Sequence, residues 1–146
     1  MIRDISIVIP IYNEQDNIIQ LIKEVRASLE KKINYEIIIV DDGSDDNTYE
    51  VVNKINKINK NINIISHKKN YGQSIGLRTG IIEANSEYIV TLDGDGQNDP
   101  RDILKLIKPF DSKVSFMMVI GNRVNRIDSK AKKVASRLAF QIRKLL

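Results

Sequence analysis

Two aspartates separated by one residue, Asp93 and Asp95, follow an apolar run in the stretch Tyr88–Pro100, YIVTLDGDGQNDP. Like charges at the end of a buried strand repel each other and lose hydration, so the pair needs a positive partner. The glycines after them, Gly94 and Gly96, let the backbone come close to a ligand. Such carboxylates suit a hard divalent cation that keeps open positions for phosphate oxygens. The pattern favours a metal that bridges a diphosphate over a purely structural Asp-Gly turn.

Alternate residues of an extended chain share a face, so both aspartates point the same way if the turn begins as strand, and Gln97 continues the alternation with an amide oxygen. An EF-hand is excluded, because Asn98 and Leu104 stand where that loop needs glycine and glutamate. A phosphorylatable receiver domain is disfavoured as well. The aspartates of IIIVDDGS follow the second predicted strand, so the order of motifs is wrong for a receiver, and the 15 positions from Asp93 to Lys108 leave no room for the intervening βα units.

Elements that would position these residues alternate along the chain. Short β-branched runs predict strands, and apolar residues three or four apart predict helices. The strands are expected at Ile5–Ile9, Tyr35–Val40, Ile62–Ser66, Tyr88–Leu92 and Phe116–Gly121. The helices are expected at Asp16–Lys31, Val51–Ile58, Gln73–Ala84 and Ser129–Leu146. A further helix, between the third and the last of these, is expected to begin after an N-cap at Asp99.

Apolar strands that alternate with helices indicate a single Rossmann-like α/β domain, with a mainly parallel sheet and helices on both faces. Such sheets bind ligands beyond the carboxyl ends of their strands. Polar clusters follow three strands there: YNE, DDGS and DGDGQ. We therefore expect the acidic loops to converge at one edge. A GxGxxG dinucleotide motif and a P-loop are both absent from the sequence.

Several other residues have a structural interpretation. Gly72, Gly76 and Gly80 are four apart, which favours close packing of a helix on the sheet over ligand contact. The pair Asp45 and Asp46 is expected to cap the following helix. His67, the single histidine, is expected at a strand end without a chemical role.

Charge divides the chain into two segments. The net charge is +4, but residues 1–128 hold 17 bases against 19 acids, whereas residues 129–146 hold six bases and no acid. We expect 1–128 to form a nucleotide-sugar-binding core and 129–146 a basic amphipathic helix of the same domain. The apolar face of this helix comprises Val134, Leu138, Ile142 and Leu145. It would either pack on the body or lie on an anionic membrane surface. No signal peptide or run of 18 apolar residues is present, and cysteine is absent, which is compatible with a cytoplasmic location.

Five motifs in order carry a family resemblance: SIVIPIYNE, IIIVDDGSDDNT, the NYG of KKNYGQSIGLRTGI, VTLDGDGQNDP and GNRVNR. The order resembles the family 2 inverting glycosyltransferases with the GT-A fold. The polyprenyl-phosphate sugar transferases, the dolichyl-phosphate mannose synthase-like branch, are the most similar. The likeness runs from about Ser6 to the end of the chain.

The resemblance implies roles for particular residues. The metal, Mg²⁺ or Mn²⁺, would be held by Asp93, Asp95 and Gln97. A UDP- or GDP-linked sugar would contact Pro10, Tyr12, Glu14, Asp42 and Asp93. The chemistry would involve Asp95, with Arg123 near the phosphates and Arg137 on the phosphate of a polyprenyl (undecaprenyl or dolichyl-type) acceptor.

The same resemblance implies a peripheral place at the inner face of the membrane and a role in the cell envelope. Nucleic acid is disfavoured as the partner of the basic segment, because this segment has no tyrosine or tryptophan for stacking and Phe140 is its one aromatic residue. Family members continue beyond the position of Leu146, so we expect a chain truncated inside the acceptor region. An alternative to the transferase is therefore a nucleotide-sugar-binding remnant without turnover.

Overall fold

Strand β1 (Asp4–Ile11) lies inside a four-stranded parallel sheet of order β3-β2-β1-β4. A computed structural model describes residues 4–111 and 118–121 of the chain. Strand β2 (Asn34–Asp41) pairs with β1 along its whole length, from Asp4 opposite Asn34 to Ile11 opposite Asp41. The outer strands are β3 (Ile62–Ser66) and β4 (Tyr88–Thr91). The predicted parallel α/β architecture is confirmed.

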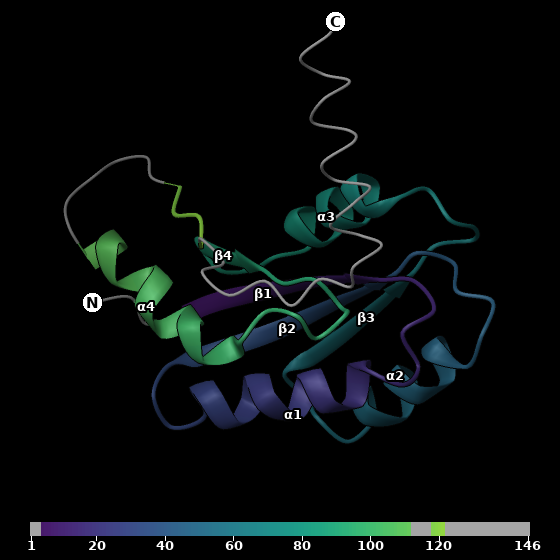
Figure 1. Cartoon of the computed structure of the whole chain (residues 1–146), viewed down its shortest axis with the longest axis horizontal. Coiled ribbons are helices and arrows are strands. Elements are labelled where there is room, and N and C mark those ends of the chain that lie inside the picture. The colour runs from purple at the N-terminus through teal and green to yellow at the C-terminus, as the bar shows by residue number, and fades with distance from the viewer. Residues whose placement is uncertain (1–3, 112–117, 122–146) are drawn as a thin grey trace, which may run out of the picture.

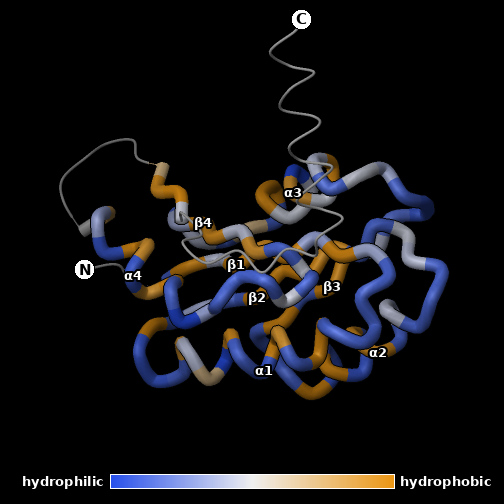
Figure 2. Tube along the Cα trace, in the orientation of Figure 1, coloured by the Kyte–Doolittle hydropathy of each residue, from blue (hydrophilic) through white to orange (hydrophobic). Residues whose placement is uncertain are grey.

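Helices cover both faces of this sheet (Figure 1). Helices α1 (Ile18–Leu29) and α2 (Thr48–Asn56) lie on one face, and α3 (Gln73–Ile82) lies on the other. A short helix, α4 (Ile103–Ile107), packs beside α1 between two 3-10 turns, η1 (Pro100–Asp102) and η2 (Lys108–Asp111). Apolar residues concentrate in the strands, whereas the loops beyond their carboxyl ends are mainly hydrophilic (Figure 2).

The two faces of β1 differ in what they bury. Its odd-numbered residues, Ile5 to Ile11, join the large core under α1 and α2. Of the even-numbered residues, Val8 joins a smaller core under α3. The strand was expected to stop before Pro10 but continues to Ile11. Proline is tolerated there because its missing N–H would point toward β4, whose pairing with β1 ends opposite Val8.

Small residues let α3 approach the sheet closely. A Cβ added at Gly80 would lie 2.4 Å from Val8 Cγ1, and one at Gly76 would lie 3.1 Å from Pro10 Cβ. Both glycines are buried. The predicted packing role is therefore confirmed for these two, whereas Gly72 precedes the helix and lines a cavity instead.

The remaining expectations have mixed outcomes. Asp99 caps η1 by accepting a hydrogen bond from Arg101 N, with Pro100 in the first turn, as predicted. The N-cap of α2 is Asn47, which makes no side-chain capping bond, so the prediction that Asp45 and Asp46 cap this helix is wrong. Asp46, one residue before the N-cap, does accept a hydrogen bond from Thr48 N (2.8 Å). The predicted fifth strand is wrong for residues 118–121, which have no regular structure and pair with no described strand.

The basic segment 129–146 lies outside the described residues, as do residues 116–117 of the predicted fifth strand. Within the part of the chain that the structure describes, no helix has the length and apolar character that a membrane span requires.

Candidate functional site

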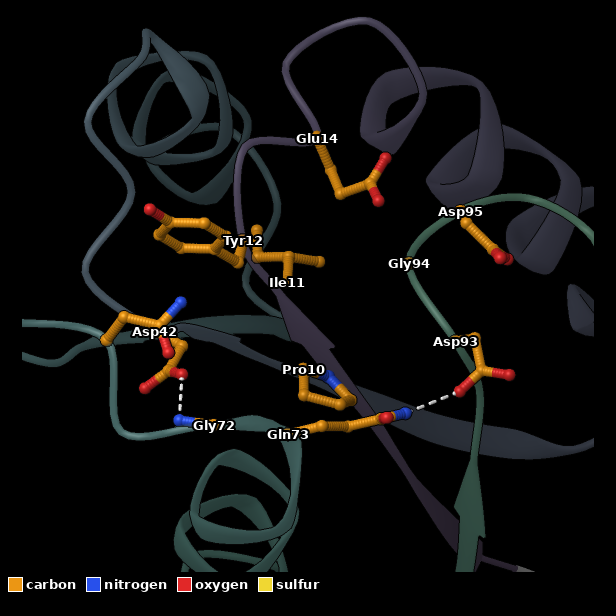
Figure 3. Close-up of a pocket in the computed structure, with 11 residues that line it drawn as sticks. Pro10, Ile11, Tyr12, Glu14, Asp42, Gly72, Gln73, Asp93, Gly94 and Asp95 are labelled. Carbon is orange, nitrogen blue, oxygen red and sulfur yellow. Dashed lines mark hydrogen bonds between the residues drawn. The ribbon is translucent and has the colours of Figure 1, made fainter. Parts of the chain in front are cut away.

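A cavity of about 350 Å³ opens at the carboxyl ends of β1, β2 and β4, where the three polar loops converge (Figure 3). One end of it is formed by Tyr12 and Asp42, and the other by Asp93 and Asp95. Glu14 faces the space between them. The complete lining is Pro10, Ile11, Tyr12, Glu14, Asp42, Asn70, Gly72, Gln73, Asp93, Gly94 and Asp95.

The loop after β1 is tied to the loop after β2 by side-chain hydrogen bonds. Asn13 N donates to Ser44 Oγ, and Asp45 N donates to Asn13 Oδ1. Glu14 N donates to Thr48 Oγ1, the buried first residue of α2. A fourth bond runs from Asn47 N to the side chain of Gln15. These bonds fix the backbone that follows Tyr12, and a hydrogen bond from Asp42 N to Ile11 O (2.8 Å) fixes the backbone before it. Together they place the exposed ring of Tyr12 beside the cavity.

Asp42 is the buried polar centre of the same region. Its residue is 3% exposed, and its carboxylate accepts hydrogen bonds from His67 Nδ1 (2.7 Å), Tyr71 N (3.0 Å) and Gly72 N (2.6 Å). Burial raises the pKa of Asp42, but these hydrogen bonds lower it by more, so the pKa lies below its ordinary value. Asp42 is therefore a stable carboxylate that joins the loop after β2 to the start of α3.

The turn after β4 brings Asp93 and Asp95 to the opposite end of the cavity. Asp93 accepts hydrogen bonds from two side-chain amides, Gln73 Nε2 at 2.8 Å and Asn98 Nδ2 at 3.2 Å. Asp95 is exposed and accepts from Gln97 N. A Cβ at Gly94 would lie 2.6 Å from Ile11 Cγ2, so only glycine lets this turn sit against the end of β1.

These two carboxylates fit a hard divalent cation that takes its other oxygens from a ligand and water. No group of three or more His, Cys, Asp or Glu side chains that could hold a metal is found among the described residues, in this cavity or outside it, so the pair by itself is an incomplete ligand set. The cavity thus offers a buried acceptor at one end and a pair of carboxylates at the other. This arrangement suits a ligand with an imide or amide at one end and phosphates at the other.

The cavity brings together most of the residues that the sequence singled out: Pro10, Tyr12, Glu14, Asp42, Asp93 and Asp95. Gln97 does not line it, and its described contact is through its backbone N–H to Asp95. Its role as a metal ligand stays a prediction. Arg123 and Arg137 lie outside the described residues.

Five lining residues were not among the predicted site residues: Ile11, Gly94, Asn70, Gly72 and Gln73. The last three belong to one segment. They are consecutive with Tyr71 in the sequence NYGQ. The signal was present, because this polar group follows β3 and opens α3, at the same edge of the sheet as the acidic loops. The contact of His67 with Asp42 had no local signal, because the two residues are 25 positions apart.

Comparisons with known proteins agree with this geometry. The sequence model of the family described as "Glycosyl transferase family 2" matches residues 6–145. The chain is 35% identical over 139 residues to an undecaprenyl-phosphate 4-deoxy-4-formamido-L-arabinose transferase of Photorhabdus laumondii. It is 39% identical over 140 residues to the protein of the same name from Yersinia pestis. In both cases 94% of this chain is aligned, and it spans 42% of the relative's own length.

Solved structures show the same fold. A mannosyltransferase from Pyrobaculum calidifontis, in complex with GDP-Man and Mn²⁺, matches 71% of this chain and 31% of its own, with a TM-score of 0.63 and 22% identity. Staphylococcus aureus TarS 1–349, in complex with UDP-GlcNAc, matches 84% of this chain and 37% of its own, with a TM-score of 0.63 and 24% identity.

Proposed function

Since this chain belongs to glycosyl transferase family 2, we propose that its cavity binds a nucleoside-diphosphate sugar together with a divalent metal. The sugar would pass to a polyprenyl phosphate, the acceptor class in the names of the undecaprenyl-phosphate transferases it resembles. One observation carries the proposal. A buried acceptor, Asp42, and a carboxylate pair, Asp93 and Asp95, form opposite ends of one cavity.

The nucleoside would bind at the end formed by Pro10, Tyr12 and Asp42. The carboxylate of Asp42 stays ionised near neutral pH because its pKa is lowered, so it can accept the imide N–H of a base. Uracil and guanine both carry such a group. Tyr12, whose residue is 42% exposed, offers a ring face on which a base can stack.

The diphosphate would bind at the end formed by Asp93 and Asp95, with Glu14 nearby and Gln97 as a further oxygen donor. A bound Mg²⁺ or Mn²⁺ would neutralise the charge that develops on the leaving diphosphate. Gln73 and Asn98 donate to the two oxygens of Asp93 and so hold its carboxylate in place. Outer contacts of this kind orient metal ligands in proteins.

Transfer would proceed with inversion at the anomeric carbon. A phosphate oxygen of the acceptor forms the new bond from the face opposite the diphosphate, and the bond to the diphosphate breaks. A phosphate monoester is largely ionised near neutral pH, so no general base is required. We assign Arg123 to the donor phosphates and Arg137 to the acceptor phosphate.

The setting we propose is the inner face of the membrane in a cell-envelope pathway. Residues 1–128 would be the donor-binding core, and the bases of 129–146 would contact anionic lipid. Binding to anionic vesicles should then weaken as salt is raised. The substrates proposed above are those named for full-length relatives, whereas this chain spans 42% of the length of such a relative. A chain that binds donor without transferring sugar is therefore the second candidate.

The test is calorimetric titration of UDP- and GDP-sugars in Mn²⁺ and in EDTA, followed by a transfer assay with polyprenyl phosphate. We expect binding of one donor in Mn²⁺ and at least tenfold weaker binding in EDTA. Asp95→Asn should remove the Mn²⁺ effect, whereas Asp102→Asn, an exposed aspartate outside the cavity, should keep it. Equal affinity in Mn²⁺ and EDTA would refute the metal. Donor binding without transfer would favour the second candidate.

A further inference from the structure

The imidazole of His67 connects Asp42, at the proposed nucleoside end of the cavity, to helix α3. His67 follows the last residue of β3, and its side chain is 12% exposed. Its Nδ1 lies 2.7 Å from Asp42 Oδ1, and its Nε2 lies 3.0 Å from Thr79 Oγ1. The three residues thus form a continuous row of carboxylate, imidazole and hydroxyl.

Chemistry fixes the proton at one end of this row. An ionised carboxylate can only accept, so the nitrogen that faces Asp42 must carry a hydrogen. The hydroxyl of Thr79 can donate to Nε2 or accept from it, so the ring is held in either charge state. His67 therefore donates to Asp42 from a ring that is anchored on its far side. Tyr71 adds an edge-to-face contact to the ring, with centroids 5.5 Å apart.

The two oxygens of the Asp42 carboxylate accept hydrogen bonds from different segments. Tyr71 N and Gly72 N approach Asp42 from the loop before α3, with Gly72 N on Oδ2, and His67 holds Oδ1 from β3. Tyr71 N lies 3.0 Å from Oδ1 and 3.1 Å from Oδ2, so without His67 the Oδ1 atom keeps only a backbone hydrogen bond that it shares with Oδ2. Rotation of the carboxylate about χ2 is then less restricted. A nucleotide base that donates a hydrogen bond to Asp42 requires the carboxylate to be held in one orientation.

We propose that His67 is a positioning residue for nucleotide recognition: it orients the Asp42 carboxylate toward the base of the donor. This inference rests on the proposed function and deepens it. It concerns the nucleoside end of the cavity and leaves the diphosphate end unaffected, because His67 does not line the cavity and has no described contact with Asp93 or Asp95.

A nucleophilic triad uses a similar order of groups, with a hydroxyl activated by a histidine and a carboxylate. That interpretation fails here on geometry. Thr79 lies in the second turn of α3 and is not among the residues that line the cavity. A substrate in this cavity therefore does not reach its hydroxyl, and the row supports binding.

Two substitutions separate the contacts of His67. Asparagine places its amide nitrogen near the position of Nδ1 and retains a donor for Asp42, whereas glutamine places it near Nε2 and loses that donor. The probes are UDP and GDP, each with Mn²⁺, and Mn²⁺-pyrophosphate, which lacks a nucleoside. Asn63→Ala, at an exposed position on β3, the strand that ends just before His67, is the control. Melting temperature is recorded for each variant.

We expect His67→Gln to weaken the binding of the preferred nucleotide about tenfold, the loss of one hydrogen bond to a charged group. Pyrophosphate binding should stay within about twofold, which also shows that the variant is folded. His67→Asn should recover most of the nucleotide affinity. In an Asp42→Asn background, His67→Gln should have almost no further effect, because residues that act through one another are not additive.

Equal nucleotide affinity in wild type and His67→Gln would overturn this inference and leave the proposed function intact. Parallel losses for nucleotide and pyrophosphate would show a merely structural role and would also overturn it. A wild-type chain that binds pyrophosphate but neither nucleotide would overturn the inference and the proposed function together.

Discussion

The loop after β2 and the loop after β4 reach the same cavity with different internal support. The loop after β2 starts from two buried aspartates, Asp41 and Asp42, whose carboxylates accept hydrogen bonds from backbone and side chains of three separate segments. The loop after β4 presents Asp93, which is half-buried, and Asp95, which is exposed. Two partners of Asp93 are the side-chain amides of Gln73 and Asn98.

This difference indicates a division of labour. A carboxylate that accepts several N–H groups in a buried place is set before any ligand arrives, and its ligand meets a preorganised acceptor. Two neighbouring carboxylates near solvent repel each other and become favourable when a cation joins them. One end of the cavity is therefore preformed by the fold, and we propose that the other is completed by a divalent metal.

The largest expected effect compares one aspartate from each loop. Asp42→Ala leaves three N–H donors without their acceptor and should lower the free energy of unfolding by about 2 to 3 kcal/mol. Asp95→Ala removes an exposed side chain and should change the free energy of unfolding by less than about 0.5 kcal/mol. The same substitution should nevertheless remove Mn²⁺-dependent binding. Urea denaturation of both variants checks the stability effects. Similar losses of stability in the two variants would contradict the proposed difference between the two loops.

Acid should reveal the same contrast. The pKa of Asp42 is lowered in the folded state, so its contribution to stability is present above the unfolded value, about 3.9. That contribution is lost as the pH falls through the folded value. The stability gap between wild type and Asp42→Ala should be constant from about pH 7 to 5 and shrink below about pH 4. A gap that widens in acid would contradict this account.

A smaller effect is expected at the metal end from Gln73, which lies outside the predicted ligand set. Gln73→Ala removes a donor to Asp93 Oδ1 and should weaken Mn²⁺ affinity roughly tenfold, the low end for outer-shell residues, because the site is exposed. Gln20→Ala, an exposed glutamine of α1, is the control. Isothermal titration with Mn²⁺ in the presence of nucleotide measures both. No change in Gln73→Ala would mean that Asp93 is oriented without it.

Much of this arrangement could be predicted from the sequence. Strand β3 was placed at its observed limits, and the other strands within two residues, because buried parallel strands read as unbroken apolar runs. The site followed from topology, since polar loops after parallel strands meet at one edge. The segment 116–121 reads as a strand by the same rule. Its described part, 118–121, nevertheless has no strand partner among the described residues, and pairing is a tertiary property.

The support of the site was beyond the reach of sequence patterns. The sequence around His67 does not predict its contact with Asp42, and the sequence around Gln73 predicts only the start of a helix. Both contacts depend on how the start of α3 sits over the sheet, which in turn depends on Gly76 and Gly80 and their distances from β1. Local patterns predict which side chains carry charge, whereas packing decides which of them meet.

In the arrangement we propose, the turn after β4 holds the metal beside a preformed nucleoside end. Its most direct test is paramagnetic broadening of backbone amide signals by Mn²⁺ in the presence of nucleotide. We predict that the first signals lost are those of residues 93–97 and of Ile11 and Tyr12. Signals of residues 44–47 and of 101–105 should persist at the same Mn²⁺ concentration, and EDTA should restore the spectrum. Broadening centred on residues 44–47 or 101–105, with Asp93 and Asp95 unaffected, would contradict the account.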